Sequence, residues 1–175
     1  MNNHNKKTSV PLRSPFLTPY GIPSDIDLKF NLSQLIEDIE KIAELARISL
    51  QEDFLLVNPL SAPHKPPHSL PEGKYAIYMF FWNDKCLKVG RVGKNSQARY
   101  TSQHYNPNSS NSNLSKFLLS RKEEFRLTVS EENIGQWIKD NCDRIDFLFS
   151  SEYGDSFPKL IEVFVQCRLT PIFEG

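Results

Sequence analysis

The segment 74–105 constrains the fold of this chain more than any other part of the sequence. It begins with a run of aromatic and apolar residues, 75–82 (YAIYMFFW), and a second strand-like run, 86–92 (CLKVGRV), follows the Asn83-Asp84 pair. Two such runs around a short Asn/Asp turn predict a β-hairpin. The chain then becomes polar and basic, and a helix is expected directly after the hairpin.

Positive charge is concentrated around the same segment. The formal net charge of the whole chain is zero, but residues 74–126 contain ten Lys or Arg and three Asp or Glu, a net charge of +7. The flanking segments 1–73 and 127–175 carry −2 and −5. A local basic surface suits the phosphate backbone of a nucleic acid. An ordinary surface, balanced by acidic neighbours in space, is an equally good interpretation of the charge alone.

Short motifs in this half of the chain resemble those of the GIY-YIG nuclease superfamily. Ala76-Ile77-Tyr78 stands at the first motif, and Lys88-Val89-Gly90 follows ten residues later as the second. Arg99 lies where the family carries an arginine, and Glu162, in the run FPKLIEVFVQCRLTPIF, lies where it carries a metal-binding glutamate. The resemblance covers roughly residues 74–175.

This resemblance implies a fold and an activity. The expected fold is a small α/β (α+β) domain over 74–175, with an antiparallel sheet of about three strands flanked by helices. Residues 1–73 would form an N-terminal arm, a helix and a Pro-rich connector. The implied activity is endonucleolytic hydrolysis of DNA phosphodiester bonds with one Mg²⁺ or Mn²⁺ ion, in restriction, defence or repair. RNA stays open as a substrate.

The resemblance also implies a role for each site residue. Glu162 would hold the metal ion, since Mg²⁺ is often bound through one or two carboxylates together with water and substrate phosphate. Arg99 would clamp the phosphate through its planar guanidinium group. Tyr78 would orient or deprotonate the attacking water, and Lys88 or the metal would supply the positive charge that this role needs. Lys88 could also act as a base itself, and His104 would relay a proton or contact a phosphate.

Other basic side chains are expected to contact the nucleic-acid backbone, namely Arg91, Lys94, Lys116 and Arg121. Every site residue also has a purely structural interpretation. Tyr78 could be a packed strand aromatic, Lys88 an exposed strand lysine, and His104 a helix cap. Glu162 could lie on the solvent face or pair with Arg99 or Arg144. Taken singly, Lys88 and His104 favour the structural interpretation; taken together, the residues favour an active site.

Departures from the family pattern motivate a second hypothesis. Ala76 replaces a glycine, Lys88 replaces a tyrosine, and the nearest candidate for a C-terminal asparagine is Glu174. The chain could therefore be a nucleic-acid-binding module of the same fold that no longer cleaves. A third, weaker hypothesis is a protein-interaction domain that uses the N-terminal helix, and the same helix could form a homodimer.

The remaining sequence predicts several elements by apolar periodicity. An irregular arm is expected over 1–24, and a helix from Asn31 to about Leu50 whose start Asn31 and Gln34 would cap. Further elements are expected as helices over 114–121, 133–141 and 157–168 and a strand over 144–149.

Two polar or proline-rich segments are expected to be connections. Five prolines in 51–73 exclude a helix or a central strand there, and they also separate His64 from His68, so a solvated linker is favoured over a metal site. The loop 106–113 is interpreted as a solvated connection, with ordering on nucleic acid as the close alternative.

Composition and the cysteine pattern indicate the cellular compartment that is expected for the protein. No apolar run is long enough to cross a bilayer, and the N-terminal stretch lacks the apolar core of a signal peptide. The three cysteines have no paired spacing, which favours reduced thiols over a disulfide framework or a zinc site. A cytoplasmic protein without membrane partners is therefore expected.

Overall fold

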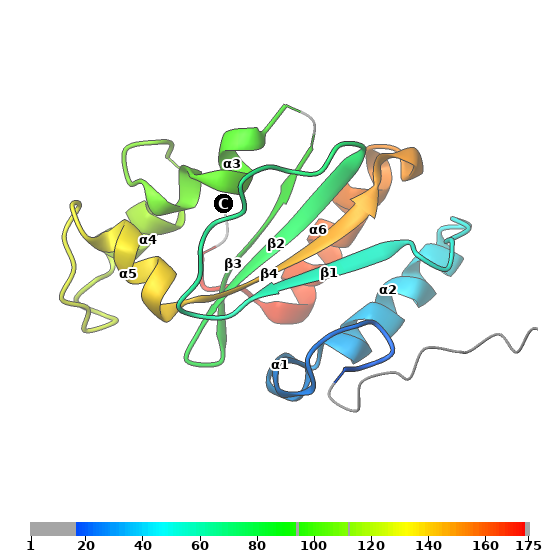
Figure 1. The fold of residues 1–175 in the computed structure, drawn as a ribbon, viewed down its shortest axis with the longest axis horizontal. Helices are drawn as coiled ribbons and strands as arrows, with labels where there is room; N and C mark the ends of the chain where they lie inside the picture. The colour runs from blue at the N-terminus through cyan, green and yellow to red at the C-terminus, as the bar shows by residue number, and fades with distance from the viewer. Residues whose placement is uncertain (1–16, 94, 112, 174–175) are drawn as a thin grey trace, which may run out of the picture.

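A four-stranded antiparallel sheet forms the centre of the fold (Figure 1). The computed structural model describes residues 17–93, 95–111 and 113–173. The strands are β1 (Leu55–Leu60), β2 (Lys74–Trp82), β3 (Lys85–Val92) and β4 (Asp143–Ser150), in the order β1-β4-β2-β3. The expected α+β class is confirmed, with four strands where about three were expected.

The predicted hairpin is confirmed in strands β2 and β3. Asn83 and Asp84 form its turn with φ angles of 48° and 59°. Positive φ at both central residues is the conformation that suits the twist of a two-residue hairpin, and Asn and Asp tolerate it better than most residues. A register shift between Phe80 and Phe81 interrupts the ladder on β2, and Phe80 pairs with Lys88.

The additional strand, β1, lies at the edge of the sheet and pairs only with β4 among the named strands. It contains Pro59, which a sheet edge tolerates because one side of the strand needs no hydrogen-bond partner. The segment expected to be a connector therefore begins with a strand, in keeping with the exclusion of a central one. Residues on both sides of the expected boundary at 73/74 belong to one sheet.

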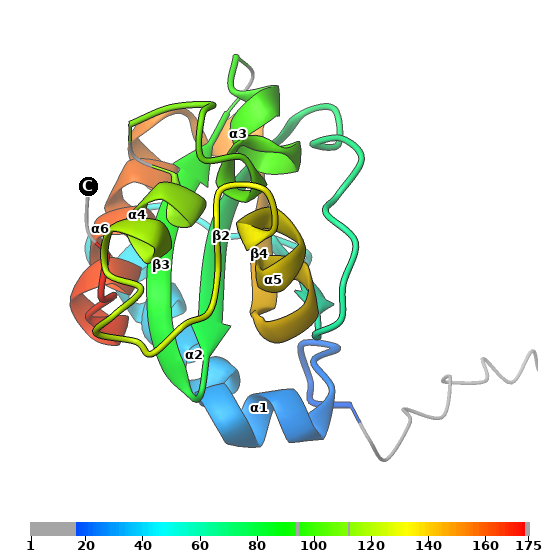
Figure 2. The ribbon, with the colours of Figure 1, turned by 90° about the vertical axis from the view of Figure 1, so that its left-hand side faces the viewer.

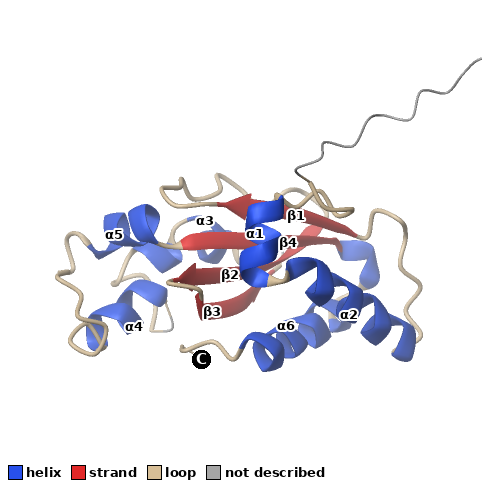
Figure 3. Ribbon diagram, turned by 90° about the horizontal axis from the view of Figure 1, so that it is seen from below, coloured by secondary structure: helices blue, strands red, loops and turns tan. Residues whose placement is uncertain are grey.

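Helices cover both faces of the sheet. One face packs against α1 (Ser24–Phe30), α2 (Leu32–Leu45) and α6 (Ser156–Leu169), and α2 and α6 lie side by side below the sheet in Figure 3. The other face carries α3 (Gln97–Thr101), α4 (Leu114–Ser120) and α5 (Ile134–Asn141), which stand in front of the strands in Figure 2. Alternate residues of β2 divide between these two cores, as the period of a strand requires.

The N-terminal helix differs from the prediction at both ends. A separate helix, α1, precedes it, and Asn31 lies between the two with a left-handed φ of 52°. Asn31 makes no side-chain cap, so the predicted capping box is wrong; the Asp27 carboxylate instead accepts a hydrogen bond from the Ser33 amide. The helix ends at Leu45 rather than near Leu50.

The other predicted elements are found within a few residues of their expected bounds. The predicted apolar face of α2 is buried, and so is most of the strand predicted over 144–149, which is β4. The helix expected after the hairpin consists of two short pieces, α3 and the 3₁₀ turn η1 (Gln103–Tyr105); a second 3₁₀ turn, η2 (Ser151–Tyr153), precedes α6. Most of the expected N-terminal arm, residues 1–16, lies outside the described part of the chain.

The end of the described chain runs beside the free edge of β3. The Ile172 and Phe173 amides donate hydrogen bonds to the Cys86 and Leu87 carbonyl oxygens, at 3.1 and 2.9 Å. These bonds cover part of an edge that would otherwise be open to pairing. None of the helices in the described residues combines the length and the apolar composition needed to cross a membrane.

Candidate active site

The centre of the candidate site is Tyr78, which β2 presents on the face covered by α3, α4 and α5. Its register partner on β3 is Gly90, and the phenol lies directly over that glycine. A Cβ added at Gly90 would lie 2.2 Å from the Tyr78 hydroxyl oxygen and 2.5 Å from the ring carbon that bears it. The two motifs therefore depend on each other, because only glycine leaves room for the buried ring.

This contact predicts the effect of enlarging the glycine. We expect Gly90→Ala to lower the free energy of unfolding by about 2–3 kcal/mol, since overpacking a filled core forces side chains or backbone to shift. Urea denaturation would measure it. Adding Tyr78→Phe, which removes the atom nearest the new methyl group, should recover part of the loss. An unchanged stability for Gly90→Ala would show that the ring has another place to lie.

Lys88 lies on the same face, as the register partner of Phe80. Only 2% of its surface is exposed, so the interpretation as an exposed strand lysine is wrong. Its Nζ lies 4.9 Å from the centroid of the Phe117 ring and has no hydrogen-bond partner among the residues that the structure describes. Burial lowers the pKa of Lys88, Arg99 lowers it further, and Glu162 acts in the opposite direction.

The Tyr78 hydroxyl is not the easily ionised group that the resemblance implied. Burial raises the pKa of Tyr78 above its ordinary value of 10.0, and of its charged neighbours Arg99 lowers it and Glu162 raises it. The net shift is opposite to the decrease expected from a nearby cation. Tyr78 therefore stays protonated near neutral pH, and the arrangement supports an orienting role rather than deprotonation of water.

Arg99 is exposed on α3, and its charge acts on the pKa of three buried groups, Tyr78, Lys88 and His104. α3 packs on the face of the sheet that carries these three residues. An exposed arginine beside buried groups can donate hydrogen bonds to a phosphate that arrives from solvent.

His104 is buried beside Tyr78 at the start of α4. It is 1% exposed, its ring centroid lies 4.6 Å from that of Tyr78, and its Nδ1 accepts a hydrogen bond from the Leu114 amide at the start of α4. Burial lowers the pKa of His104 well below its ordinary value. The imidazole is therefore neutral, and its Nε2 has no hydrogen-bond partner among the described residues.

Glu162 lies on α6 at the edge of the site, with its carboxylate partly exposed. Its Oε2 accepts a hydrogen bond from the Nε of Arg91 at 3.2 Å. The partner is thus neither Arg99 nor Arg144, the two that the sequence suggested. Arg91 had been expected to contact nucleic acid.

The groups around Glu162 fit a metal ion only if the ion brings most of its own ligands. Within residues 17–93, 95–111 and 113–173, there is no group of three or more His, Cys, Asp or Glu side chains that could hold a metal. Mg²⁺ can be bound by a single carboxylate when water and substrate phosphate fill its other positions. Glu162 alone satisfies this limited requirement.

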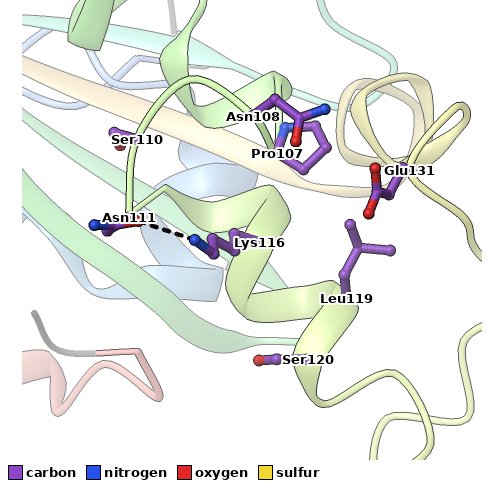
Figure 4. Close-up of a pocket in the computed structure, with 8 residues that line it drawn as sticks. All are labelled: Pro107, Asn108, Ser110, Asn111, Lys116, Leu119, Ser120 and Glu131. Carbon is purple, nitrogen blue, oxygen red and sulfur yellow. Dashed lines mark hydrogen bonds between the residues drawn. The ribbon is translucent and has the colours of Figure 1, made fainter.

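Of the remaining basic residues expected at the site, Arg121 and Lys116 lie elsewhere in the described structure. Arg121 pairs with Glu124 and lies over the Phe125 and Phe173 rings, and Lys94 lies outside the described residues. Lys116 lines a surface pocket between the loop 106–113 and α4, where its Nζ donates to Asn111 at 3.0 Å (Figure 4).

Hydrogen bonds within the loop 106–113 fix its shape. The Asn113 amide donates to the Pro107 and Ser110 carbonyl oxygens, and the Asn113 Oδ1 accepts from the Lys116 amide at the start of α4. The described residues of this loop therefore form hydrogen bonds among themselves, and whether the loop also responds to nucleic acid stays a prediction.

A buried ion pair beneath the site was not predicted from the sequence. Arg144 and Asp146 on β4 are both fully buried, and the Arg144 Nε donates to the Asp146 Oδ1 at 2.8 Å. The Arg144 Nη1 also donates to the Tyr100 carbonyl oxygen at 2.8 Å and to the Tyr105 hydroxyl at 3.4 Å. The pair thus ties α3 and η1 to the sheet. The signal in the sequence was two opposite charges two residues apart on one face of a predicted strand.

His64 extends this buried network, so the prediction of a solvated linker is wrong at this residue. It is 8% exposed, and its Nε2 lies 2.8 Å from the Tyr105 hydroxyl. The connector between β1 and β2 therefore packs against the helices of the site.

Comparison of the chain with protein-family models, with curated proteins and with solved structures found no match in any of the three. What the chain does is therefore inferred from its own residues.

Proposed function

We propose that this chain is a divalent-metal-dependent endonuclease that hydrolyses phosphodiester bonds of DNA. One observation carries the proposal: Tyr78 and Lys88 are both buried on the same face of the β2–β3 hairpin, and the Lys88 amine has no hydrogen-bond partner among the described residues. Arg99 is exposed on α3, which covers this face, and the Glu162 carboxylate on α6 is partly exposed. These side chains offer a phosphate clamp, a carboxylate, a hydroxyl and an amine, which are groups that such hydrolysis can use. The resemblance of the two strand motifs to GIY-YIG nucleases supports the same assignment.

In the proposed mechanism, the protonation state of each side chain decides its role in hydrolysis. Arg99 binds a non-bridging phosphate oxygen and stabilises the charge that develops on it. The Tyr78 hydroxyl orients the attacking water, and Lys88, in its neutral form, accepts the proton of that water. The hydroxide then forms a bond to phosphorus, the bond to the leaving oxygen breaks, and the leaving oxygen is protonated by solvent.

Glu162 would hold the Mg²⁺ or Mn²⁺ ion, which as a Lewis acid would help to neutralise the phosphate and the leaving oxygen. Since the described residues contain no group of three or more His, Cys, Asp or Glu side chains that could hold a metal, water and the substrate would complete the coordination. Removal of the metal by a chelator is expected to stop cleavage.

The proposal is tested by cleavage of supercoiled plasmid in Mg²⁺ or Mn²⁺. We expect the wild type to nick or linearise the plasmid and Arg99→Ala and Glu162→Ala to slow it by about 10²–10³-fold, the scale of losing one stabilising group. Lys159→Ala, a change of an exposed residue on the same helix as Glu162, is the control and should cleave normally. Cleavage that survives Glu162→Ala would place the metal elsewhere.

The pairing of Glu162 with Arg91 favours a second candidate, a nucleic-acid-binding module that does not cleave. In that protein the carboxylate would serve only to hold Arg91. Such a module predicts duplex binding that weakens steeply as salt concentration rises, and no product from plasmid, short duplexes or single strands in either metal.

A further inference from the structure

Arg91 occupies the one carboxylate at which the proposed nuclease would bind its metal. The Arg91 Nε lies 3.2 Å from the Glu162 Oε2, and 27% and 23% of the two side chains are exposed. Arg91 comes from β3 and Glu162 from α6, so the contact joins two elements rather than neighbours in sequence. Partial exposure leaves both groups able to exchange partners with solutes.

Arg91 also borders a surface pocket beside the site. The pocket is lined by Tyr75, Arg91, Gly93, Asn95, Ser96 and Asp155. The carboxylate among these, Asp155, accepts a hydrogen bond from the Tyr75 hydroxyl. Arg91, Asn95 and Ser96 line the pocket and have side-chain hydrogen-bond donors. Donors of this kind can bind the oxygen atoms of one phosphate group.

Two cations cannot share Glu162 without cost. A divalent ion at the carboxylate would lie beside the guanidinium group of Arg91, and like charges at such separations repel strongly outside bulk water. Arg99 adds further positive charge near the same site. In the free protein, the charges around Glu162 therefore favour the binding of an anion over the binding of a metal ion.

We propose that Arg91 couples metal binding to nucleic-acid binding. A substrate phosphate that enters the pocket pairs with Arg91 and draws it away from Glu162, and the carboxylate then becomes available to Mg²⁺ or Mn²⁺. This inference rests on the proposed nuclease function and specifies its regulation: the metal site is completed only when a nucleic acid is bound. By linkage, the metal and the nucleic acid each strengthen the binding of the other to the same extent.

Calorimetric titration of the full chain with Mn²⁺ tests the coupling without any measurement of cleavage. The titration is made with and without a phosphorothioate duplex that resists hydrolysis. We expect weak binding to the wild type alone and binding at least about tenfold tighter with the duplex, a modest electrostatic coupling. Arg91→Gln should bind Mn²⁺ about tenfold more tightly than the wild type without the duplex, and the further gain from the duplex should shrink.

Two variants identify the carboxylate and control for the loss of an arginine. Glu162→Gln should abolish the tight Mn²⁺ binding in every condition. Arg168→Gln removes a different arginine, which lies on α6 and pairs with the Asp38 carboxylate at 3.5 Å, and it should leave Mn²⁺ binding unchanged. Equal Mn²⁺ affinity of Arg91→Gln and the wild type without the duplex would overturn the coupling.

The outcomes separate this inference from the proposed function. If the wild type cleaves plasmid and binds Mn²⁺ at Glu162 equally well with and without the duplex, the nuclease stands and the coupling fails. If the wild type binds no Mn²⁺ in any condition and cleaves no nucleic acid, the proposed function itself fails, and the coupling with it.

Discussion

Replacing Asp146 with alanine should lower the free energy of unfolding by about 3–5 kcal/mol, the cost of leaving one member of a buried ion pair without its partner. Both Arg144 and Asp146 are completely buried, so water cannot take the place of the lost carboxylate without opening the core. Arg144 also holds the Tyr100 carbonyl oxygen of α3, so the loss should reach the helix that carries Arg99. Urea denaturation gives the change in free energy.

Asp146→Asn is the matched control for this substitution. It keeps the size of the side chain and an oxygen that can accept from the Arg144 Nε, but it removes the negative charge. We expect a smaller loss than for Asp146→Ala, because the arginine keeps a hydrogen-bond acceptor. A loss below about 1 kcal/mol for Asp146→Ala, the scale of an exposed ion pair, would show that the pair does not support the fold as described.

Replacing Lys88 with methionine should abolish most cleavage while it stabilises the protein. A general base contributes about 10²–10⁴-fold to the rate of a proton transfer, and methionine cannot accept the proton. The same change removes a buried amine that has no partner among the described residues, so unfolding should cost about 1–2 kcal/mol more. Single-turnover cleavage and urea denaturation measure the two effects on the same variant.

The pH dependence and a second variant separate a base from a mere positive charge. Since burial lowers the pKa of Lys88, the neutral and active form should become populated below the pKa of a free lysine. Cleavage by the wild type should therefore rise with pH through that lowered value and then level off. Lys88→Arg keeps the charge but cannot deprotonate in this range, so it should lose cleavage as Lys88→Met does. Full activity of Lys88→Arg would assign Lys88 an electrostatic role only.

The sequence supported the hairpin well because both of its signals are local. Period-two apolar runs and an Asn-Asp turn act within a few residues of each other, and the turn adopts the expected positive φ angles. The spacing of Tyr78 and Gly90 then follows from the register of the two strands. The late helix α6 was also predicted nearly within its bounds, because Ser156 and Pro158 are typical of a helix start after the turn at Gly154.

Features that depend on partners distant in sequence were missed. β1 is a strand because it pairs with β4. No local pattern in the sequence predicted this pairing, and β1 contains Pro59. His64 is buried because Tyr105 lies 2.8 Å from it. The break at Asn31 is a left-handed residue between two helices, where the local sequence suggested a simple cap.

For the charged residues of the site, too, the sequence predicted the residues but not their partners in space. The sequence identified Lys88, Arg99 and Glu162 as candidates, but their burial decides their chemistry. Lys88 is buried and Arg99 is exposed, and Glu162 pairs with Arg91, which had been assigned to the nucleic acid. Protonation depends on these surroundings, so the residue types alone left open whether Tyr78 or Lys88 would act as the base in the proposed mechanism.

The most direct test of the proposed function compares wild type and Arg99→Ala in single-turnover cleavage of one supercoiled plasmid in Mn²⁺. Each protein is used above its own measured dissociation constant for the plasmid, so that weaker binding cannot explain a slower reaction. The account predicts wild-type cleavage that a chelator abolishes, and a rate about 10²–10³-fold lower for Arg99→Ala at saturation. Equal rates for the two saturated proteins, or no cleavage by the wild type, would contradict it.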